Sequence, residues 1–124
     1  MADAATIKAL GGLELQLRKL VALGESSHVA AQAGVRYSID EPRTYLSSNI
    51  TGTFNIIEAA DKAKVNHLII ASSSSVYGAN TNIPYREIDK AQTQLSVYAA
   101  TKKSTESIAH SYSNIWRLPI TMLR

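Results

Sequence analysis

Residues 67–78 read His-Leu-Ile-Ile-Ala-Ser-Ser-Ser-Ser-Val-Tyr-Gly. The continuous apolar, β-branched run at 67–71 is typical of a strand buried on both faces, as in a parallel sheet. Four serines at 72–75 follow the end of that strand. Because ligands bind beyond the carboxyl ends of the strands in open parallel sheets, we expect these hydroxyls to line a crevice. Taken alone, a serine-rich run is more often a loop that satisfies its own backbone.

Helical patterns lie on both sides of this strand. Acids and a proline at 40–42 form a helix-start signal and predict a helix over 42–64. Helical spacing also predicts a helix over 96–115, and an apolar run at 119–123 predicts a second buried strand. The apolar residues that define the two helices are Leu46, Ile50, Phe54 and Ile57 in the first, and Val97, Ile108, Tyr112 and Ile115 in the second.

The N-terminal part continues the alternation of helices and strands. Apolar spacing predicts a helix over 4–23, and the small residues at 28–34 favour the end of a short strand. The whole order predicts an α/β fold with a parallel sheet and right-handed crossovers. We divide the chain into an N-terminal helical segment, 1–27, whose place in the fold is open, and an α/β unit, 28–124.

Composition excludes several classes of protein and site. The chain has 124 residues, of which 45% are hydrophobic and 19% charged, enough for one small globular domain. No apolar run approaches the roughly 20 residues that cross a bilayer. With no cysteine, disulfides, thiolate nucleophiles and cysteine-ligated metals are excluded. The three histidines share no ligand spacing, so we expect no metal site.

The net charge and the N-terminal sequence indicate which binding partners and which cell compartment to expect. The formal charge is +3, but the lysines and arginines are scattered and no aromatic residues interleave with them, so we do not expect nucleic-acid binding. The N-terminus lacks a basic start followed by an apolar stretch, so we expect no signal peptide and a cytoplasmic protein.

Tyr98 and Lys102 form a candidate acid/base pair. The spacing Tyr98-Ala-Ala-Thr-Lys102 places a phenol and an ammonium one helical turn apart on the same face. Phenols ordinarily have a pKa of about 10 and are poor bases at neutral pH, but a fixed neighbouring cation favours the phenolate. Chance supplies such pairs often, so this pair alone is a weak signal.

Together, these features resemble the extended short-chain dehydrogenase/reductase family of NAD-dependent nucleotide-sugar epimerases and dehydratases. The resemblance rests on Ser73, on Val-Tyr-Gly at 76–78, and on Tyr98 and Lys102. It continues in His-Val-Ala-Ala at 28–31, Asn-Ile-Thr-Gly-Thr at 49–53 and Met-Leu-Arg at 122–124, and covers about residues 28–124. Within the family, the stretches 30–38 and 71–78 are most similar to UDP-glucuronate 4-epimerases.

The resemblance implies a role for each candidate residue in NAD-dependent epimerisation at C4 of a UDP-sugar. Tyr98 would take the proton of the sugar 4-hydroxyl while C4 gives hydride to NAD, and the 4-keto intermediate would receive hydride on its other face. Lys102 would hold the nicotinamide ribose and favour the ionised form of Tyr98. Ser73 would hydrogen-bond the sugar oxygen. The residues that would contact or support the cofactor are Ala30, Ala31, Asn49, Tyr98 and Lys102.

Two serines help to choose the reaction. Family members that dehydrate the sugar carry acids at the positions matching Ser74 and Ser75, because elimination needs an acid for the leaving hydroxyl. Serine has no usable acid near neutrality, so these residues favour simple epimerisation. They could also donate hydrogen bonds to a substrate carboxylate. Arg36 is a further candidate for recognition of that charge, although a solvated loop arginine explains it equally well.

The sequence departs from the family in its glycines. No G-x-x-G-x-x-G or G-x-G-x-x-G occurs in the chain, and that motif binds the dinucleotide pyrophosphate. We therefore expect a partial Rossmann-like sheet flanked by helices, a central segment without the glycine-turn βα unit and the C-terminal substrate domain. Such a chain would bind NAD poorly. The alternative is a non-catalytic interaction module without a cofactor. The family also implies a possible homodimer through helices 42–64 and 96–115.

Overall fold

The computed structural model describes residues 31–124. The predicted helix over 4–23, the first residues of the predicted strand at 28–34, and Ala30 lie outside the described residues. The elements in chain order are α2 (Tyr37–Asp40), α3 (Pro42–Tyr45), the π-helical stretch η1 (Leu46–Thr51), α4 (Gly52–Lys62), β1 (Leu68–Ala71), the 3₁₀ turn η2 (Ser74–Tyr77), α5 (Val97–Trp116) and β2 (Ile120–Leu123).

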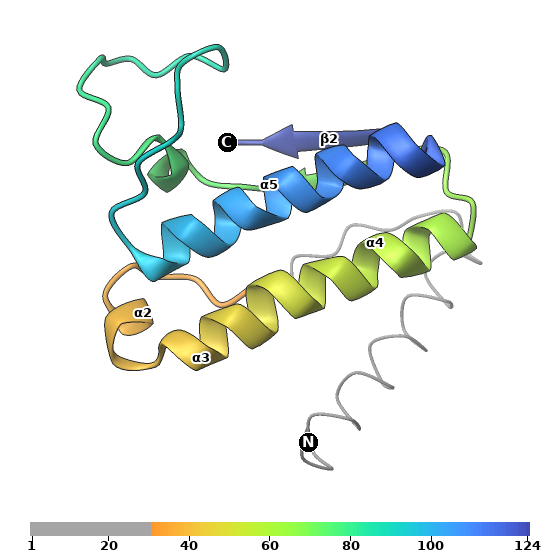
Figure 1. Cartoon of the computed structure of the whole chain (residues 1–124), viewed down its shortest axis with the longest axis horizontal. Coiled ribbons are helices and arrows are strands. Elements are labelled where there is room, and N and C mark those ends of the chain that lie inside the picture. Colours follow the sequence, from red (N-terminus) through yellow and green to blue (C-terminus); the bar gives the residue numbers. More distant parts are fainter. Residues whose placement is uncertain (1–30) are drawn as a thin grey trace.

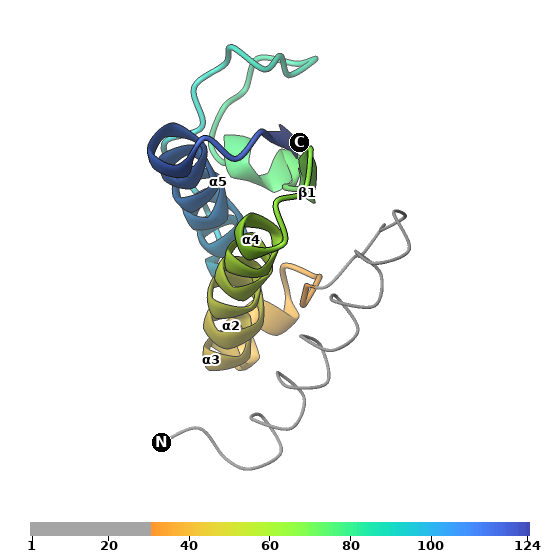
Figure 2. The ribbon, with the colours of Figure 1, turned by 90° about the vertical axis from the view of Figure 1, so that its right-hand side faces the viewer.

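The two strands β1 and β2 form a parallel sheet. Leu68 pairs with Ile120 and Ala71 pairs with Leu123, so both predicted strands and their parallel arrangement are confirmed. The helices α4 and α5 lie side by side and cover one face of the sheet, as the two views of the ribbon show (Figures 1 and 2). The predicted third strand does not extend into the described part of the chain, because residues 31–34 have no strand structure.

The core lies between this helical layer and one face of the sheet. Ile57 and Ala60 of α4, Ala109 of α5 and Leu118 form its buried centre. The strand residues that pack against this centre are Leu68, Ile70, Ile120 and Met122. The prediction that the strand at 67–71 is buried on both faces is wrong for this chain, since Ile69 is 64% exposed. The described helices pack on only one side of the sheet, which leaves alternate strand residues uncovered.

Helix α5 confirms the predicted helix over 96–115 almost to the residue. The Ser96 side chain accepts a hydrogen bond from the Ala99 amide, which satisfies one of the unpaired N–H groups at the helix start. The helix ends where Arg117 adopts a left-handed conformation with a φ of 62°. Leu118 and Pro119 then turn the chain back into β2.

The predicted helix over 42–64 is present as three successive segments, α3, η1 and α4. Pro42 occupies its first turn, where a missing amide hydrogen costs nothing. The last helical residue is Lys62, because Lys64 has a left-handed φ of 52°. The π-helical stretch was not predicted. Its wider turn changes which side chains face α5.

Residues 79–94 form a loop outside helices and strands. Gly78 begins it with a φ of 55°, and a Cβ at this position would overlap the Thr93 carbonyl. Only glycine therefore allows the two ends of the loop to approach so closely. None of the helices among residues 31–124 is long and apolar enough to cross a membrane.

Candidate functional site

Lys102 joins α5 to the sheet. Its Nζ donates a hydrogen bond of 3.0 Å to the Ala71 carbonyl at the carboxyl end of β1. The side chain is buried, and this desolvation lowers the pKa of Lys102 below its ordinary value. Tyr98 lies one turn earlier on α5 and is partly exposed. Helix α5 thus carries a partly exposed phenol, Tyr98, and a buried cation, Lys102, near the carboxyl end of β1.

Ser73 lies at the same edge and begins the 3₁₀ turn. Its Oγ accepts a hydrogen bond of 3.1 Å from the Ser75 amide, which is the capping interaction at the start of η2. The hydroxyl proton of Ser73 is not used in this contact and can be donated elsewhere. Ser74 is exposed and Ser75 half-buried. Since η2 packs against α5, the serine turn and the Tyr98–Lys102 face belong to one site.

Asn49 is buried and contacts backbone rather than solvent. Its Oδ1 accepts from the Gln32 amide at 2.8 Å, and its Nδ2 donates to the Gln32 carbonyl and to Thr101 Oγ1, each at 3.1 Å. The amide is therefore committed to the segment 31–34 and to α5. Asn49 could support a cofactor only indirectly, by fixing this segment.

Two of the predicted site residues lie at the surface of the chain. Ala31 and Arg36 are both exposed. Within the described residues, no hydrogen bond or ion pair joins Arg36 to the serine turn, to Tyr98 or to Lys102. The structure therefore brings together Ser73, Tyr98, Lys102 and Asn49, and leaves Arg36 at the surface.

Glu106 is a buried residue of the site that the sequence did not single out. Its carboxylate accepts hydrogen bonds from Ser72 Oγ at 2.7 Å, Lys103 Nζ at 2.9 Å, and Arg124 Nε and Nη2 at 2.8 Å each. Although desolvation opposes ionisation, these donors lower the pKa of Glu106 to about 2. Glu106 lies one turn beyond Lys102. This spacing of one turn from the Tyr98–Lys102 pair is the sequence feature that could have indicated Glu106.

Arg124 and Tyr77 extend this charged network toward the loop. The Arg124 guanidinium lies 5.2 Å from the centre of the Tyr77 ring, a cation–π arrangement. The Tyr77 ring also stacks on Tyr85, with ring centres 4.6 Å apart, and its hydroxyl donates to the Arg86 carbonyl. Glu106 of α5 therefore joins that helix to Ser72, which follows β1, and to Arg124, which follows β2.

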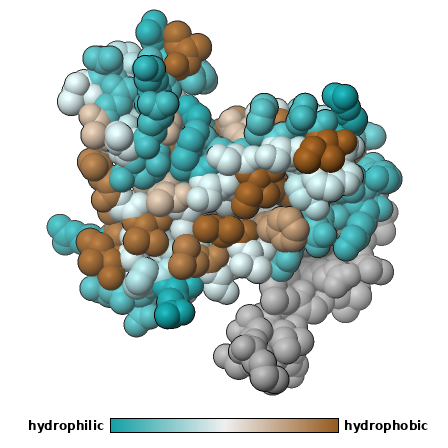
Figure 3. All heavy atoms as spheres, in the orientation of Figure 1, coloured by the Kyte–Doolittle hydropathy of each residue, from teal (hydrophilic) through white to brown (hydrophobic). Residues whose placement is uncertain are grey.

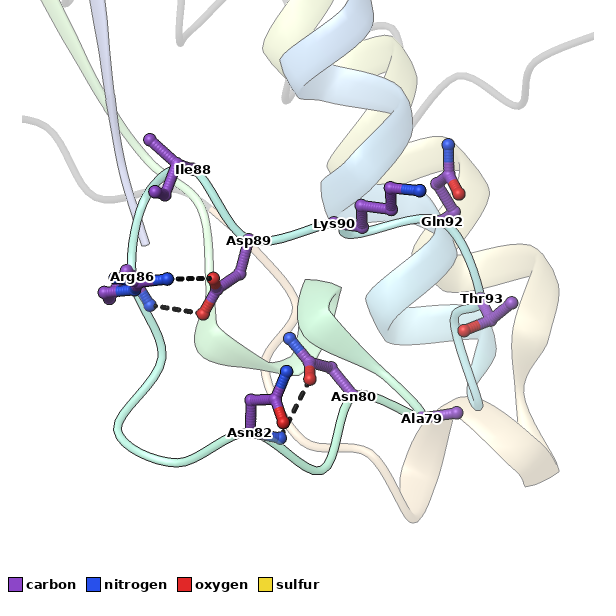
Figure 4. A pocket seen from close by; sticks show the side chains of 9 residues that line it. All are labelled: Ala79, Asn80, Asn82, Arg86, Ile88, Asp89, Lys90, Gln92 and Thr93. Atoms are coloured by element: carbon purple, nitrogen blue, oxygen red, sulfur yellow. Dashed lines mark hydrogen bonds and ion pairs between the residues drawn. The ribbon is translucent and has the colours of Figure 1, made fainter.

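An open pocket of about 510 Å³ lies in the loop and away from these residues. Figure 4 shows Arg86 bonded to Asp89 and Asn82 bonded to Asn80 along its wall. None of Ser73, Tyr98 and Lys102 lines it. Within residues 31–124 there is also no group of three or more histidine, aspartate or glutamate side chains placed to hold a metal ion.

Lys102 offers a direct test of whether these residues fit NAD. An ammonium has three N–H donors, and the hydrogen bond that it makes within the described residues goes to the Ala71 carbonyl. A buried cation with donors to spare, at the carboxyl edge of a parallel sheet, suits the hydroxyls of a nucleotide ribose. The residues therefore fit the nicotinamide side of the cofactor.

Comparison with known proteins assigns the chain to a family. A family model described as GDP-mannose 4,6 dehydratase matches residues 16–124. The chain belongs to this family. The predicted kinship with nucleotide-sugar epimerases and dehydratases is confirmed, and so is the partial α/β fold.

Two bacterial proteins are among the relatives whose sequences are similar to this one. Protein CapI of Staphylococcus aureus is 57% identical over 97 residues, which cover 78% of this chain and 29% of CapI. A probable UDP-glucuronate 4-epimerase of Rhizobium meliloti is 48% identical over 97 residues, 78% of this chain and 28% of that protein. The chain thus spans less than a third of the length of these relatives.

A solved structure shows the same similarity. UDP-glucuronic acid 4-epimerase from Bacillus cereus, crystallised in complex with UDP-glucuronic acid and NAD, matches with a TM-score of 0.71 at 35% identity. The match covers 79% of this chain and 31% of the Bacillus chain.

Proposed function

We propose that this chain is the catalytic-tyrosine segment of a nucleotide-sugar 4-epimerase that acts on UDP-glucuronate with NAD. The observation that carries the proposal is the hydrogen bond from Lys102 Nζ to the Ala71 carbonyl. This bond fixes the face of α5 that bears Tyr98 against the carboxyl end of β1, next to Ser73. The similarity to proteins named as UDP-glucuronate 4-epimerases supports the choice of reaction.

Each of the three residues then has a defined task. The Tyr98 phenolate removes the proton of the sugar 4-hydroxyl and later returns it. The remaining N–H donors of Lys102 hold ribose hydroxyls. Ser73 donates its hydroxyl proton to the same sugar oxygen. When bound, NAD would supply the redox chemistry: it would accept hydride from C4, and the NADH so formed would return that hydride to the opposite face of the ketone, which would invert that carbon.

The serine turn favours a uronic acid that is epimerised without elimination. Ser74 and Ser75 provide hydroxyl donors of suitable exposure for a carboxylate, and neither can protonate a leaving hydroxyl. These residues therefore support UDP-glucuronate over a sugar that must be dehydrated.

A chimaera tests the proposal whatever the length of the natural protein. Residues 28–124 replace the matching segment of the Bacillus enzyme, and proton NMR follows conversion of UDP-glucuronate into its C4 epimer. We expect turnover, and a fall of at least about 100-fold in kcat for Tyr98→Phe, the usual contribution of a general base. The control Tyr112→Phe makes the same change elsewhere on α5 and should leave kcat unchanged. Equal rates for the Tyr98→Phe chimaera and its parent would contradict the assignment.

The second candidate function is a non-catalytic interaction module. The observation that favours it is the absence from this sequence of a glycine-rich dinucleotide motif. It predicts a chimaera that folds and binds NAD through the Bacillus portion but does not convert the sugar. Circular dichroism and NAD titration of the chimaera therefore separate the two functions.

The helical layer is the proposed contact with a second copy of the chain. Hydrophobic residues gather on the outer face formed by α3, α4 and α5 (Figure 3). Four large apolar side chains of η1, α4 and α5 are 38–62% exposed, namely Leu46, Phe54, Ile115 and Trp116. Burial of such a face against its own copy would remove this apolar area from water.

A further inference from the structure

Tyr45 is a buried residue of α3 to which the proposed mechanism gives no task. Its side chain is fully buried, and its hydroxyl donates to the Gly34 carbonyl at 2.7 Å and to the Ala33 carbonyl at 3.0 Å. Burial raises the pKa of the Tyr45 phenol above its ordinary value, so the hydroxyl keeps its proton and stays a donor. Tyr45 therefore holds backbone that follows Ala31.

Asn49, one turn later, holds the preceding peptide groups. It bonds both the amide and the carbonyl of Gln32, as described above. Residues 31–34 form no strand or helix, and Gly34 has a φ of 105°, so local backbone pairing does not fix this segment. Its hydrogen bonds to the rest of the described chain come from these two side chains.

The same two side chains also reach the catalytic helix. The edge of the Tyr45 ring meets the Tyr98 ring, with centres 6.2 Å apart and an angle of 83° between the planes. This is the edge-to-face geometry that aromatic pairs prefer. Asn49 bonds Thr101, the residue before Lys102. One side of α5 is thus tied to segment 31–34 at two successive turns.

We propose that Tyr45 is a positioning residue that sets the place of segment 31–34 relative to the Tyr98 ring. The inference rests on the proposed function, in which Tyr98 faces the sugar, and on the expectation from the sequence that Ala31, at the start of this segment, contacts or supports the cofactor. The hydroxyl holds the backbone while the ring of the same residue holds Tyr98. In the proposed arrangement, the sugar carbon and the nicotinamide meet between segment 31–34 and Tyr98. The Tyr45 side chain contacts both of these.

Tyr45→Phe separates the two halves of this role. Phenylalanine keeps the ring edge against Tyr98 and removes the donor to the Ala33 and Gly34 carbonyls. The matched control is Tyr37→Phe, which makes the same change on a 47% exposed neighbour whose ring centre lies 6.1 Å from that of Tyr45.

The first measurement is NMR on the whole 124-residue chain. In Tyr45→Phe we expect the Gln32 amide to exchange with solvent at least about tenfold faster, because its segment opens locally, and the Tyr98 ring signals to move. Tyr37→Phe should change neither. A folded Tyr45→Phe variant with the wild-type Gln32 exchange rate and Tyr98 signals would overturn the inference.

The second measurement is an NMR titration with NAD of the chimaera described above and of its Tyr45→Phe and Tyr37→Phe variants, because the 124-residue chain lacks the glycine motif that binds the pyrophosphate. We expect NAD to perturb residues 31–34 and Tyr98, and its Kd to rise at least about fivefold in Tyr45→Phe, as for one lost hydrogen bond in the support of a site. A variant with altered exchange but an unchanged Kd would overturn the role toward the cofactor. If the parent chimaera shows no NAD perturbation of these residues, the cofactor side of the proposed function fails, while the exchange data still decide the role of Tyr45.

Replacement of Tyr45 by p-aminophenylalanine restores a donor on the same ring. Recovery of wild-type Gln32 exchange and NAD affinity would assign both effects to the hydrogen bonds. This variant also decides the matter if Tyr45→Phe does not fold. A folded p-aminophenylalanine variant with weakened NAD binding and rapid Gln32 exchange would overturn the inference.

Discussion

Glu106→Gln should remove most of the acid sensitivity that the buried network gives the chain. The side chains around this carboxylate lower its pKa from 4.5 to about 2. At 1.36 kcal/mol per pKa unit, this shift amounts to at most about 3 kcal/mol of free energy of unfolding. Because the pKa is lower in the folded state, that stability is present above pH 4.5 and is lost as the pH falls toward 2.

Urea unfolding followed by circular dichroism between pH 2 and 6 measures this effect. The wild-type chain should lose up to about 3 kcal/mol more than Glu106→Gln across this range, since glutamine does not titrate. At pH 6, Glu106→Gln should be the less stable of the two, because Arg124 and Lys103 lose their ionised partner. Glu58→Gln is the control, since its carboxylate lies 3.9 Å from Lys62 in a largely exposed pair. Parallel pH profiles for wild type and Glu106→Gln would refute the reasoning.

Three further changes test other parts of the structure. Lys102→Met should change Tm by no more than about 4 °C, because removal of a buried charge offsets the loss of one hydrogen bond. The same substitution should lower kcat of the chimaera at least about 100-fold. A large fall in Tm would instead show that the role of Lys102 is mainly structural. Gly78→Ala should cost at least about 2 kcal/mol in urea unfolding, through overlap with the Thr93 carbonyl and a positive φ; wild-type stability would contradict that geometry. Trp116→Lys should convert any dimer into monomer in light scattering, whereas Ile83→Lys, on the 80% exposed loop residue, should not; a dimer that survives Trp116→Lys would place the interface elsewhere.

The sequence predicted those elements whose signals are local. Ser96 caps α5 and the apolar spacing behind it continues to the last turn, so the helix could be placed to within a residue. The parallel pairing of the strands followed from the helical crossover between them. Tyr98 and Lys102 share a helix face because their spacing is one turn, which the sequence alone determines.

The remaining features depend on contacts between distant segments. The apolar run at 67–71 indicates a buried strand, but it does not show which other elements cover each face of that strand. The exposure of Ile69 could therefore not be predicted. The role of Glu106 depends on Arg124, eighteen residues away, and on Ser72 in another element. Asn49 was expected to contact or support the cofactor, but the sequence does not show that its side chain bonds Gln32 and Thr101 in two other segments.

The length of α5 has a practical consequence for anyone who wishes to re-engineer this molecule. The residues proposed to carry the chemistry lie in its first half, around Lys102, while exposed apolar side chains extend to Trp116 at its end. At a rise of 1.5 Å per residue, roughly 21 Å separates these positions along the axis. Changes at the far end should therefore allow assembly and solubility to be tuned independently of turnover.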